Sequence, residues 1–272
     1  MSEKSEKVAW EAEQRKSPSG AVVYKAILQE GFDELSRPPS ALFWSGLAAG
    51  LSMGASLIAE GLLSSHLPEA PWRPLVSKFG YSVGFLVVIL GRQQLFTENT
   101  LTPILPLLKE KTWHRFGRVM RLWGIVLFSN LLGCIAAAWV SDLKVAFEPD
   151  VRAQFAEIGR EAMRGSFGVH VMHGVFAGWL IALMVWLLPF AENARLWVII
   201  ILSYFVGLGH FSHVVAGAVQ TFYAAFAGEN TWVEVFGRYL APTFIGNVIG
   251  GVALVAALNH AQVVSGSKGE NI

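Results

Sequence analysis

Two of the long apolar stretches in this chain are interrupted by polar residues where a membrane-spanning helix would still be crossing the bilayer. One stretch runs from Phe79 to Leu90 and is followed by GRQQLFTENTL, residues 91–101. The other interruption is GHFSHVVAG, residues 209–217. Lipid offers no hydrogen-bond partners, so irregular polar backbone persists at membrane depth only where protein covers it or where it borders a wet cavity. Two interrupted segments in corresponding halves predict a transport site between them.

The apolar pattern predicts six membrane segments, each near the ~20 residues that a helix needs to span a bilayer. They are residues 41–63, 77–101, 116–140, 168–190, 196–227 and 237–260. The interrupted segments are the middle members of two groups of three. An odd number of crossings inverts the second group relative to the first. We therefore expect an all-α integral membrane protein with an inverted three-plus-three repeat, in which helices 2 and 5 are broken and face each other near the midplane.

The flanking regions are more polar than the six segments. Residues 1–20 are rich in charge and are predicted to form a disordered cytoplasmic N-terminus. Residues 21–36 place Val23, Ala26 and Ile27 at helical spacing beside charged positions, which predicts an amphipathic cytoplasmic helix. We assign residues 37–262 to the transmembrane domain and residues 263–272 to a cytoplasmic tail. No cleavable signal peptide is expected, because the first 36 residues contain no apolar core of the required length.

Composition and charge agree with a membrane protein. Hydrophobic residues make up 53% of the chain and charged residues only 15%, whereas the net charge of +1 gives no indication of a nucleic-acid partner. The single cysteine, Cys134, excludes an internal disulfide and a cysteine-based zinc site. The densest basic cluster lies in residues 109–121, and further basic residues precede the first segment. The positive-inside rule then places this cluster and both termini in the cytoplasm.

His213 is the sharpest candidate for a functional residue. An ionisable group inside a membrane segment usually faces a cavity or a pathway, and an imidazole exchanges protons near neutral pH. A packed histidine bonded to a backbone carbonyl is the alternative, but the position of His213 inside an interruption favours the pathway. Asn247, in the last segment, either presents an amide to a pore or makes a helix–helix hydrogen bond, and the pattern favours neither.

Two further patterns were weighed. Four bulky residues at or before the first interruption suit an apolar constriction, although they suit packing as well: Tyr81, Phe85, Leu95 and Phe96. Two histidine pairs at i, i+3 spacing would suit a metal or haem: His170 with His173, and His210 with His213. No Glu-x-x-His motif accompanies them, so we predict no metal and no cofactor.

Several motifs together resemble the formate/nitrite transporter family. They are Leu95-Phe96-Thr97, His213-Val-Val-Ala-Gly, PTFIGNVIGG at 242–251, GVFAGWL at 174–180 and NLLG at 130–133. The resemblance covers about residues 21–260. It implies a homopentamer of aquaporin-like protomers in a bacterial inner membrane, with a pore through each protomer for formate, nitrite or hydrosulfide.

The resemblance also implies roles for particular residues. Leu95, Phe96 and Thr97 would lie beside the pore, with His213 at its centre and Asn247 nearby. Tyr81 and Phe85, with Val206 or its neighbour Phe205, would form constrictions.

The chain departs from the family pattern at four positions. Gln94 and Ser212 stand where the family prefers acids, Glu98 where a small residue is usual, and Gly178 where asparagine is common. The vestibule lysine of the family has no clear counterpart in this chain, and Arg160 or Arg164 would be the cation in its place.

We therefore expect a channel or transporter, not an enzyme, for a small monovalent anion. Protons, membrane lipid and further copies of the chain are the expected partners, and passage is either passive or proton-coupled through His213. A channel for a neutral solute and a histidine-ligated metal or haem protein are the alternatives.

Overall fold

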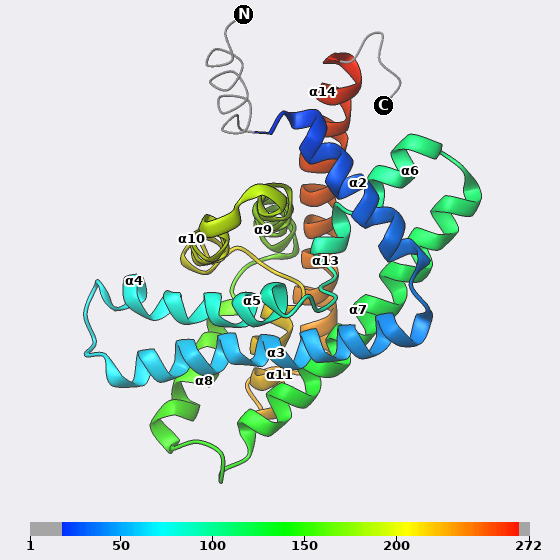
Figure 1. Ribbon diagram of the computed structural model, residues 1–272. Coiled ribbons are helices and arrows are strands. Elements are labelled where there is room, and N and C mark those ends of the chain that lie inside the picture. Colours follow the sequence, from blue (N-terminus) through cyan, green and yellow to red (C-terminus); the bar gives the residue numbers. More distant parts are fainter. Residues whose placement is uncertain (1–17, 267–272) are drawn as a thin grey trace, which may run out of the picture.

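The structure, a computed structural model, describes residues 18–266, and within this range the chain is helical without strands (Figure 1). Residues 1–17 and 267–272, which hold most of the two predicted tails, lie outside the described range. Labels beginning with η mark 3₁₀ or π segments. In chain order the elements are α2 (Gly20–Ser36), α3 (Pro39–His66), α4 (Arg73–Ser77), η1 (Lys78–Gly80), α5 (Tyr81–Leu90), η2 (Glu98–Thr100), α6 (Ile104–Glu110), α7 (Trp113–Asp142), α8 (Pro149–Ala162), α9 (Phe167–Leu187), η3 (Leu188–Phe190), η4 (Glu192–Ala194), α10 (Arg195–Leu208), α11 (Ala216–Phe226), α12 (Trp232–Glu234), η5 (Val235–Leu240), α13 (Ala241–Val248), η6 (Ile249–Ala257) and α14 (Leu258–Gly266).

Five helices of the described region are long and apolar enough to cross a membrane: Pro39–His66, Arg73–Leu90, Trp113–Asp142, Phe167–Phe190 and Trp232–Val263. The predicted segment 196–227 is instead made of α10, with 14 residues, and α11, with 11 residues, and each is too short to cross alone. The predicted segment 77–101 also differs, because its helix begins earlier, at Arg73, and ends at Leu90. The last helix continues to Gly266, beyond the predicted boundary at 262.

Close helix contacts hold the molecule together. Helix α3 packs along α7, and α9 packs along α13, while α5 lies against α10. A Cβ atom on Gly50 would lie 2.1 Å from the carbonyl oxygen of Asn130, and a Cβ on Gly178 would lie 2.3 Å from that of Asn247. Backbones that approach so closely require glycine. This contact explains why Gly178 stands where the family commonly has asparagine, since any side chain there would push α9 away from α13.

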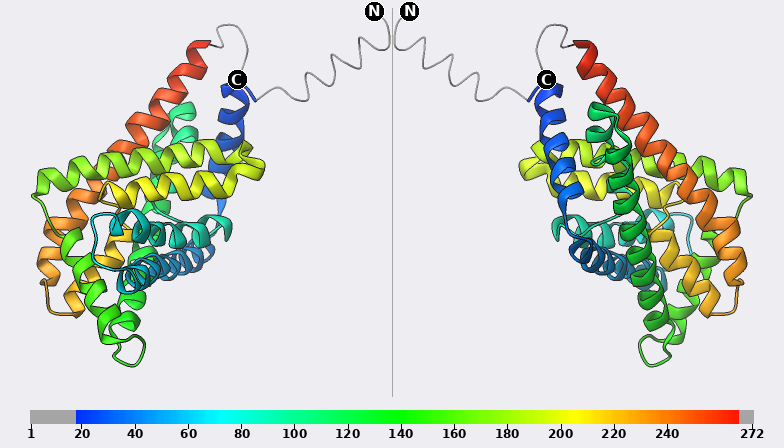
Figure 2. Two further views of the ribbon diagram at one scale, coloured as in Figure 1. Left: turned by 90° about the vertical axis from the view of Figure 1, so that its left-hand side faces the viewer. Right: turned by 90° about the vertical axis from the view of Figure 1, so that its right-hand side faces the viewer.

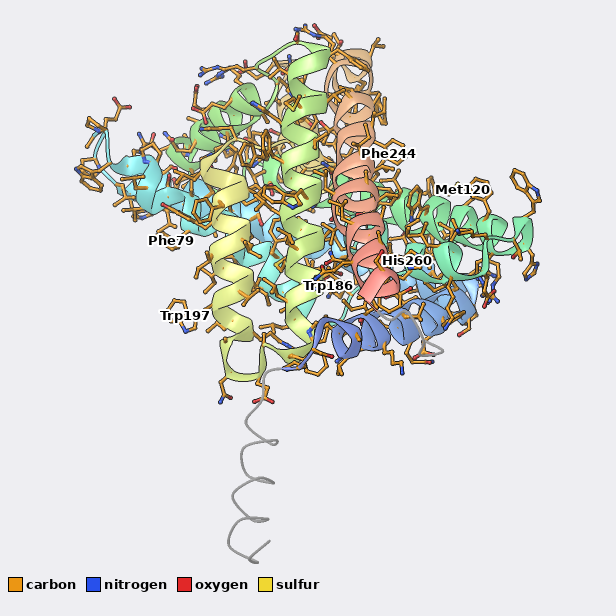
Figure 3. The ribbon with its side chains drawn as sticks, turned by 90° about the horizontal axis from the view of Figure 1, so that it is seen from above. Phe79, Met120, Trp186, Trp197, Phe244 and His260 are labelled. Carbon is orange, nitrogen blue, oxygen red and sulfur yellow. The ribbon has the colours of Figure 1, made fainter. Side chains whose placement is uncertain are left out.

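Helix α2 packs across one end of the molecule, next to α14 and α6 (Figures 1 and 2). Its buried face recurs at helical spacing and consists of Tyr24, Ile27, Leu28, Gly31 and Leu35. The Tyr24 hydroxyl lies 2.7 Å from Nδ1 of His260, and Figure 3 shows His260 at the end of the last helix, beside α2.

The basic cluster of residues 109–121 contributes to the docking of α2. The guanidinium groups of Arg118 and Arg121 donate to the carbonyl oxygen of Leu35, at 2.5 and 3.0 Å. Cations at the C-terminus of a helix satisfy its free carbonyls and complement its dipole. Part of the basic cluster that predicts the orientation in the membrane therefore also stabilises the docking of α2.

Large apolar side chains project outward from the bundle. Phe79 is 50% exposed and Trp197 is 61% exposed, and both point away from the helices in Figure 3. An exposed apolar surface of this kind is typical of a protein surrounded by lipid or by further subunits. The architecture is therefore that of an all-helical, multi-pass membrane protein.

Candidate functional site

The chain leaves α5 and α10 with the same backbone geometry. Arg92 and His210 are the second residues after these helices, and both have a left-handed φ of 50°. The residue after each of them donates its N–H at 3.0 Å to a carbonyl five residues earlier, at Val88 and at Val206. This is the Schellman arrangement that ends helices, usually with glycine at the left-handed position. Non-glycine residues in this conformation cost roughly 1–2 kcal/mol each, so the surrounding structure must hold both turns.

Asn130, in the middle of α7, binds the first interruption. Its Oδ1 accepts a hydrogen bond from the N–H of Phe96 at 2.9 Å. Its Nδ2 donates to the carbonyl oxygens of Gly46 and Gln94, both at 2.8 Å. The side chain is fully buried, and it supplies partners for the N–H of Phe96 and the carbonyl of Gln94, which lie outside any helix.

Asn247, on α13, binds the second interruption with the same set of contacts. Its Oδ1 accepts from the N–H of Val214 at 2.9 Å, and its Nδ2 donates to the carbonyl oxygens of Gly174 and Ser212, both at 2.9 Å. The amide therefore has both its oxygen and its nitrogen engaged with backbone. This geometry fits the second of the two readings of Asn247, in which the amide holds helices together.

His213 and Thr97 join the two interruptions. The Nδ1 atom of His213 accepts hydrogen bonds from the N–H groups of Ala216, at 3.0 Å, and Val215, at 3.3 Å. Nδ1 must therefore be unprotonated, so the ring proton lies on Nε2. Nε2 is 2.8 Å from Oγ1 of Thr97 and donates to it. The hydroxyl proton of Thr97 is then free to donate to another group.

Aromatic rings and one valine surround this pair on one side. The ring of Phe85 meets the ring of His213 edge-on, with centroids 5.1 Å apart, and Tyr81 lies 5.5 Å from Phe85. Val206 is fully buried and lines a cavity with Tyr81, whereas its neighbour Phe205 is 53% exposed and does not line that cavity. Of the two alternatives at this position, only Val206 lies where a constriction would need it.

Leu95 and Phe96 are also buried, but Phe96 lies among packing residues. Its ring centroid is 5.6 Å from that of Trp123 and 5.4 Å from that of Phe244, on α7 and α13. Leu95 is fully buried next to it in the chain. The backbone of this motif, held by Asn130, positions Thr97.

Two cavities are lined by residues close in the chain to this pair. The larger has a volume of about 600 Å³ and is lined by α2, the first interruption and the residues around η3 and the start of α10, with Gln94, Glu98 and Arg195 in its wall. The smaller has a volume of about 30 Å³ and is lined by Tyr81, Val206 and Ser212 among others. Phe85, Thr97 and His213 line neither cavity, but Glu98, next to Thr97 in the chain, lines the larger one, and Ser212, next to His213, lines the smaller one.

The departure at Gln94 has a structural reason. Its Nε2 donates to Oε1 of Glu34 on α2 at 3.0 Å, and the Thr102 hydroxyl donates to Oε2 of the same carboxyl at 2.8 Å. Burial raises the pKa of Glu34, although these two hydrogen bonds partly oppose the shift. An acid at position 94 would place two carboxyl groups against each other, so the amide allows α2 to dock.

A Gln94→Glu protein is expected to release α2 as the pH rises. With a raised pKa, the Glu34 carboxyl is protonated at low pH and can donate to the new carboxylate; once it ionises, like charges repel and docking weakens by about 1–3 kcal/mol. The distance between spin labels at Lys25→Cys on α2 and Lys109→Cys on α6 should therefore lengthen with rising pH. Gln93→Glu is the matched control, and an equal response in both proteins would contradict the assigned contact.

The remaining sequence candidates lie elsewhere. His170 accepts or donates a hydrogen bond at 3.1 Å between its Nδ1 and the hydroxyl of Ser212. Among residues 18–266, no group of three or more His, Cys, Asp or Glu side chains is arranged to hold a metal. Arg160 pairs with Glu157 at 2.6 Å, and Arg164 pairs with the same carboxylate; neither arginine lines a cavity.

The cation that does line the smaller cavity is Lys78, which the sequence reasoning missed. Its Nζ lies 2.5 Å from Oε1 of Glu60, on α3. Both residues carried a visible signal, because Glu60 lies inside the predicted segment 41–63 and Lys78 inside 77–101. An ionisable pair within apolar segments is a functional candidate.

Comparison with known proteins agrees with this architecture. A family model described as Formate/nitrite transporter matches residues 21–261. The chain is 40% identical over 254 residues to the inner membrane protein YfdC of Escherichia coli K12, covering 93% of this chain and 82% of that protein. It is 26% identical over 242 residues to the formate channel BtFdhC of Bacillus thuringiensis, covering 86% and 91%.

Two solved structures share the fold at 18% sequence identity. One is described as an FNT family ion channel, with a TM-score of 0.78, covering 88% of this chain and 98% of that one. The other is a pentameric formate channel with formate bound, with a TM-score of 0.68, covering 83% and 98%. From the extent of the family match and the identity to YfdC, this chain belongs to the formate/nitrite transporter family of membrane transporters.

Proposed function

We propose that the protein passes a small monovalent anion of the formate, nitrite or hydrosulfide type, or its conjugate acid, through the space between the two interruptions. The observation that carries this proposal is the hydrogen bond between Thr97 and His213, because the residues next to them in the chain, Glu98 and Ser212, line two different cavities. The membership of the family and the likeness to formate channels support the same class of solute.

The two matching asparagine sites support an inverted repeat. Asn130 and Asn247 bind equivalent backbone groups of the two interruptions, and equivalent left-handed turns precede both. Two broken helices related in this way bring their irregular backbones together near the midplane. The positive-inside rule then places α2 and the larger cavity on the cytoplasmic side of a bacterial inner membrane.

A pentamer is the proposed assembly. The fold neighbour with formate bound is pentameric, and large apolar side chains cover the outer surface of this chain. Subunits and lipid would share that surface.

The site offers a hydrogen bond where a solute loses its water. Removing an anion from water into an apolar constriction costs far more than removing the neutral acid. The Thr97 hydroxyl is available to donate to the solute, because its oxygen already accepts from Nε2 of His213. A donor in a water-excluded site is worth more than one in bulk water.

The ring geometry favours a hydrogen-bond role for His213 over a role as proton carrier. A second ring proton would have to sit on Nδ1, where the N–H groups of Val215 and Ala216 already point at the ring. We propose that a proton accompanying the solute travels on the solute itself.

A substrate panel in proteoliposomes with an imposed pH gradient tests this function. Uptake of formate, nitrite or hydrosulfide above that of empty liposomes, and exclusion of glycerol, is the expected result. A protein that passes glycerol but none of the three would instead be a neutral-solute channel.

A further inference from the structure

The smaller cavity contains a lysine whose charge is already matched. Lys78 and Glu60 are both buried, with side chains 8% and 2% exposed, and they form an ion pair with an N–O distance of 2.5 Å. Glu161, on α8, brings a second carboxylate to 4.0 Å from the same ammonium and lines the cavity. One ammonium and two carboxylates therefore lie in or next to the wall of this cavity, which we take as one mouth of the proposed path.

This arrangement changes what the mouth attracts. An unpaired lysine in a cleft with low-dielectric walls focuses a positive potential and raises the local concentration of anions. A carboxylate in direct contact cancels that potential beyond the pair, and a second carboxylate reverses its sign. The His210 ring, also in the wall, adds no charge in its neutral form.

Glu60 also has an oxygen that the ion pair does not use. Its Oε2 is buried and has no hydrogen-bond partner among the described residues. One oxygen of this buried carboxylate therefore has no hydrogen-bond donor that would offset its negative charge, and only Lys78 does so through the other oxygen.

The larger cavity shows a similar balance. Its wall carries four carboxyl groups and three guanidinium groups: Glu30, Asp33, Glu34 and Glu98, with Arg37, Arg92 and Arg195. Neither mouth therefore presents a surplus of positive charge.

We propose that the mouths of this protein discriminate against free anions, so that a weak acid enters the smaller cavity in its undissociated form, with Glu161 as a specificity-determining residue. This inference rests on the proposed function, and it narrows the substrate to the neutral acid. The solute that reaches Thr97 is then uncharged, so removing its water costs less free energy than removing the water of an anion.

The test measures initial uptake of formate and of nitrate, the anion of a strong acid, into proteoliposomes at low and high ionic strength. In the unmodified protein, formate uptake should rise about tenfold when the external pH falls by about one unit, in proportion to the undissociated acid. It should change little with salt, and nitrate uptake should stay at the level of empty liposomes.

Glu161→Gln and Glu161→Lys make the charge around the smaller cavity progressively more positive. The side chain of Glu161 is partly exposed, so we expect both variants to fold. Uptake of both anions at neutral pH should rise in that order, on the order of tenfold for Glu161→Lys at low ionic strength. High salt should abolish the rise by screening. Asp150→Asn is the matched control, since it removes an exposed carboxylate from the same helix outside both cavities, and its uptake should equal that of the unmodified protein.

The outcomes separate the two proposals. Nitrate uptake by the unmodified protein that falls steeply with salt would show an attracting mouth and overturn this inference alone. The same holds if both Glu161 variants behave like Asp150→Asn while formate uptake persists. A folded protein that takes up neither formate nor nitrite nor hydrosulfide would overturn the proposed function and this inference together.

Discussion

Proteoliposomes carrying His213→Asn are expected to take up formate roughly 10 to 100 times more slowly than those carrying the unmodified protein. Asparagine can still accept the N–H groups of Val215 and Ala216, as Nδ1 does now, but it cannot reach Thr97. Without the donor from the ring, the Thr97 hydroxyl turns its own proton away from the solute path. A hydrogen bond to the formate anion is worth about 1.5–3 kcal/mol, which corresponds to that range of rates, whereas one to the undissociated acid is worth about 0.5–1.5 kcal/mol and would give a decrease of about 2 to 10 times.

His213→Ala removes the backbone contacts as well and is expected to lose both uptake and stability. The comparison of the two variants separates a role in the path from a role in the fold. Thr97→Val should reproduce the slow uptake of His213→Asn, and Thr97→Ser, which keeps the hydroxyl, should restore most of it. Normal uptake in both His213→Asn and Thr97→Val would remove the pair from the mechanism.

His173→Ala is the matched control for the loss of an imidazole in the membrane. His173 lies on α9 and contacts the ring of Phe211, with centroids 6.0 Å apart, but it lines neither cavity. Its removal should leave formate uptake within about twofold of normal, because surface and peripheral changes usually cost less than about 0.5 kcal/mol.

The second large effect is expected on folding. Asn247→Ala leaves the N–H of Val214 and the carbonyl of Ser212, both in the interruption, without their partner in a buried site, and it also removes the bond to Gly174 within α9. Each unsatisfied buried group costs about 1–3 kcal/mol, so the total is a large part of the stability of a typical protein. The thermal unfolding temperature in detergent and the yield of folded protein on gel filtration should both fall sharply.

Asn130→Ala should have an effect of similar size, because Asn130 holds the other interruption with the same set of contacts. Asn259→Ala is the matched control, since its amide donates only to the carbonyl of Val255 within the same helical run. If Asn247→Ala unfolds at the same temperature as Asn259→Ala, the bonds of Asn247 to the interruption do not stabilise the fold.

Much of the architecture was predictable because lipid imposes strong rules on sequence. The long apolar segments, their polar interruptions and the buried face of α2 follow from helical periodicity and from the lack of hydrogen-bond partners in the bilayer. The basic cluster of residues 109–121 has a second role besides setting the orientation in the membrane, since Arg118 and Arg121 also bond to the end of α2. The break within residues 196–227 was expected at this position, but the lengths of the two helices on either side of it, α10 and α11, were not.

The candidate site was predictable in part. His213 was a candidate from its place in an interruption and Thr97 from the family resemblance, but nothing in the pattern indicated that they bond to each other. Lys78 and Glu60 were overlooked, although each is an ionisable residue within an apolar segment. The choice between Val206 and Phe205 needed the rotation of α10, which packing against α5 determines.

The sequence alone determined which stretches are helical, where two of them must be interrupted, and to which family the chain is similar. These properties depend on neighbours along the chain and on the polarity of the surroundings, so short stretches of sequence are enough to determine them. Only the tertiary structure decided which groups meet: Asn130 and Asn247 with the interruptions, Gln94 with Glu34, and Lys78 with Glu60. Such contacts depend on the rotation and register of helices far apart in the chain, which close glycine contacts and buried hydrogen bonds set together.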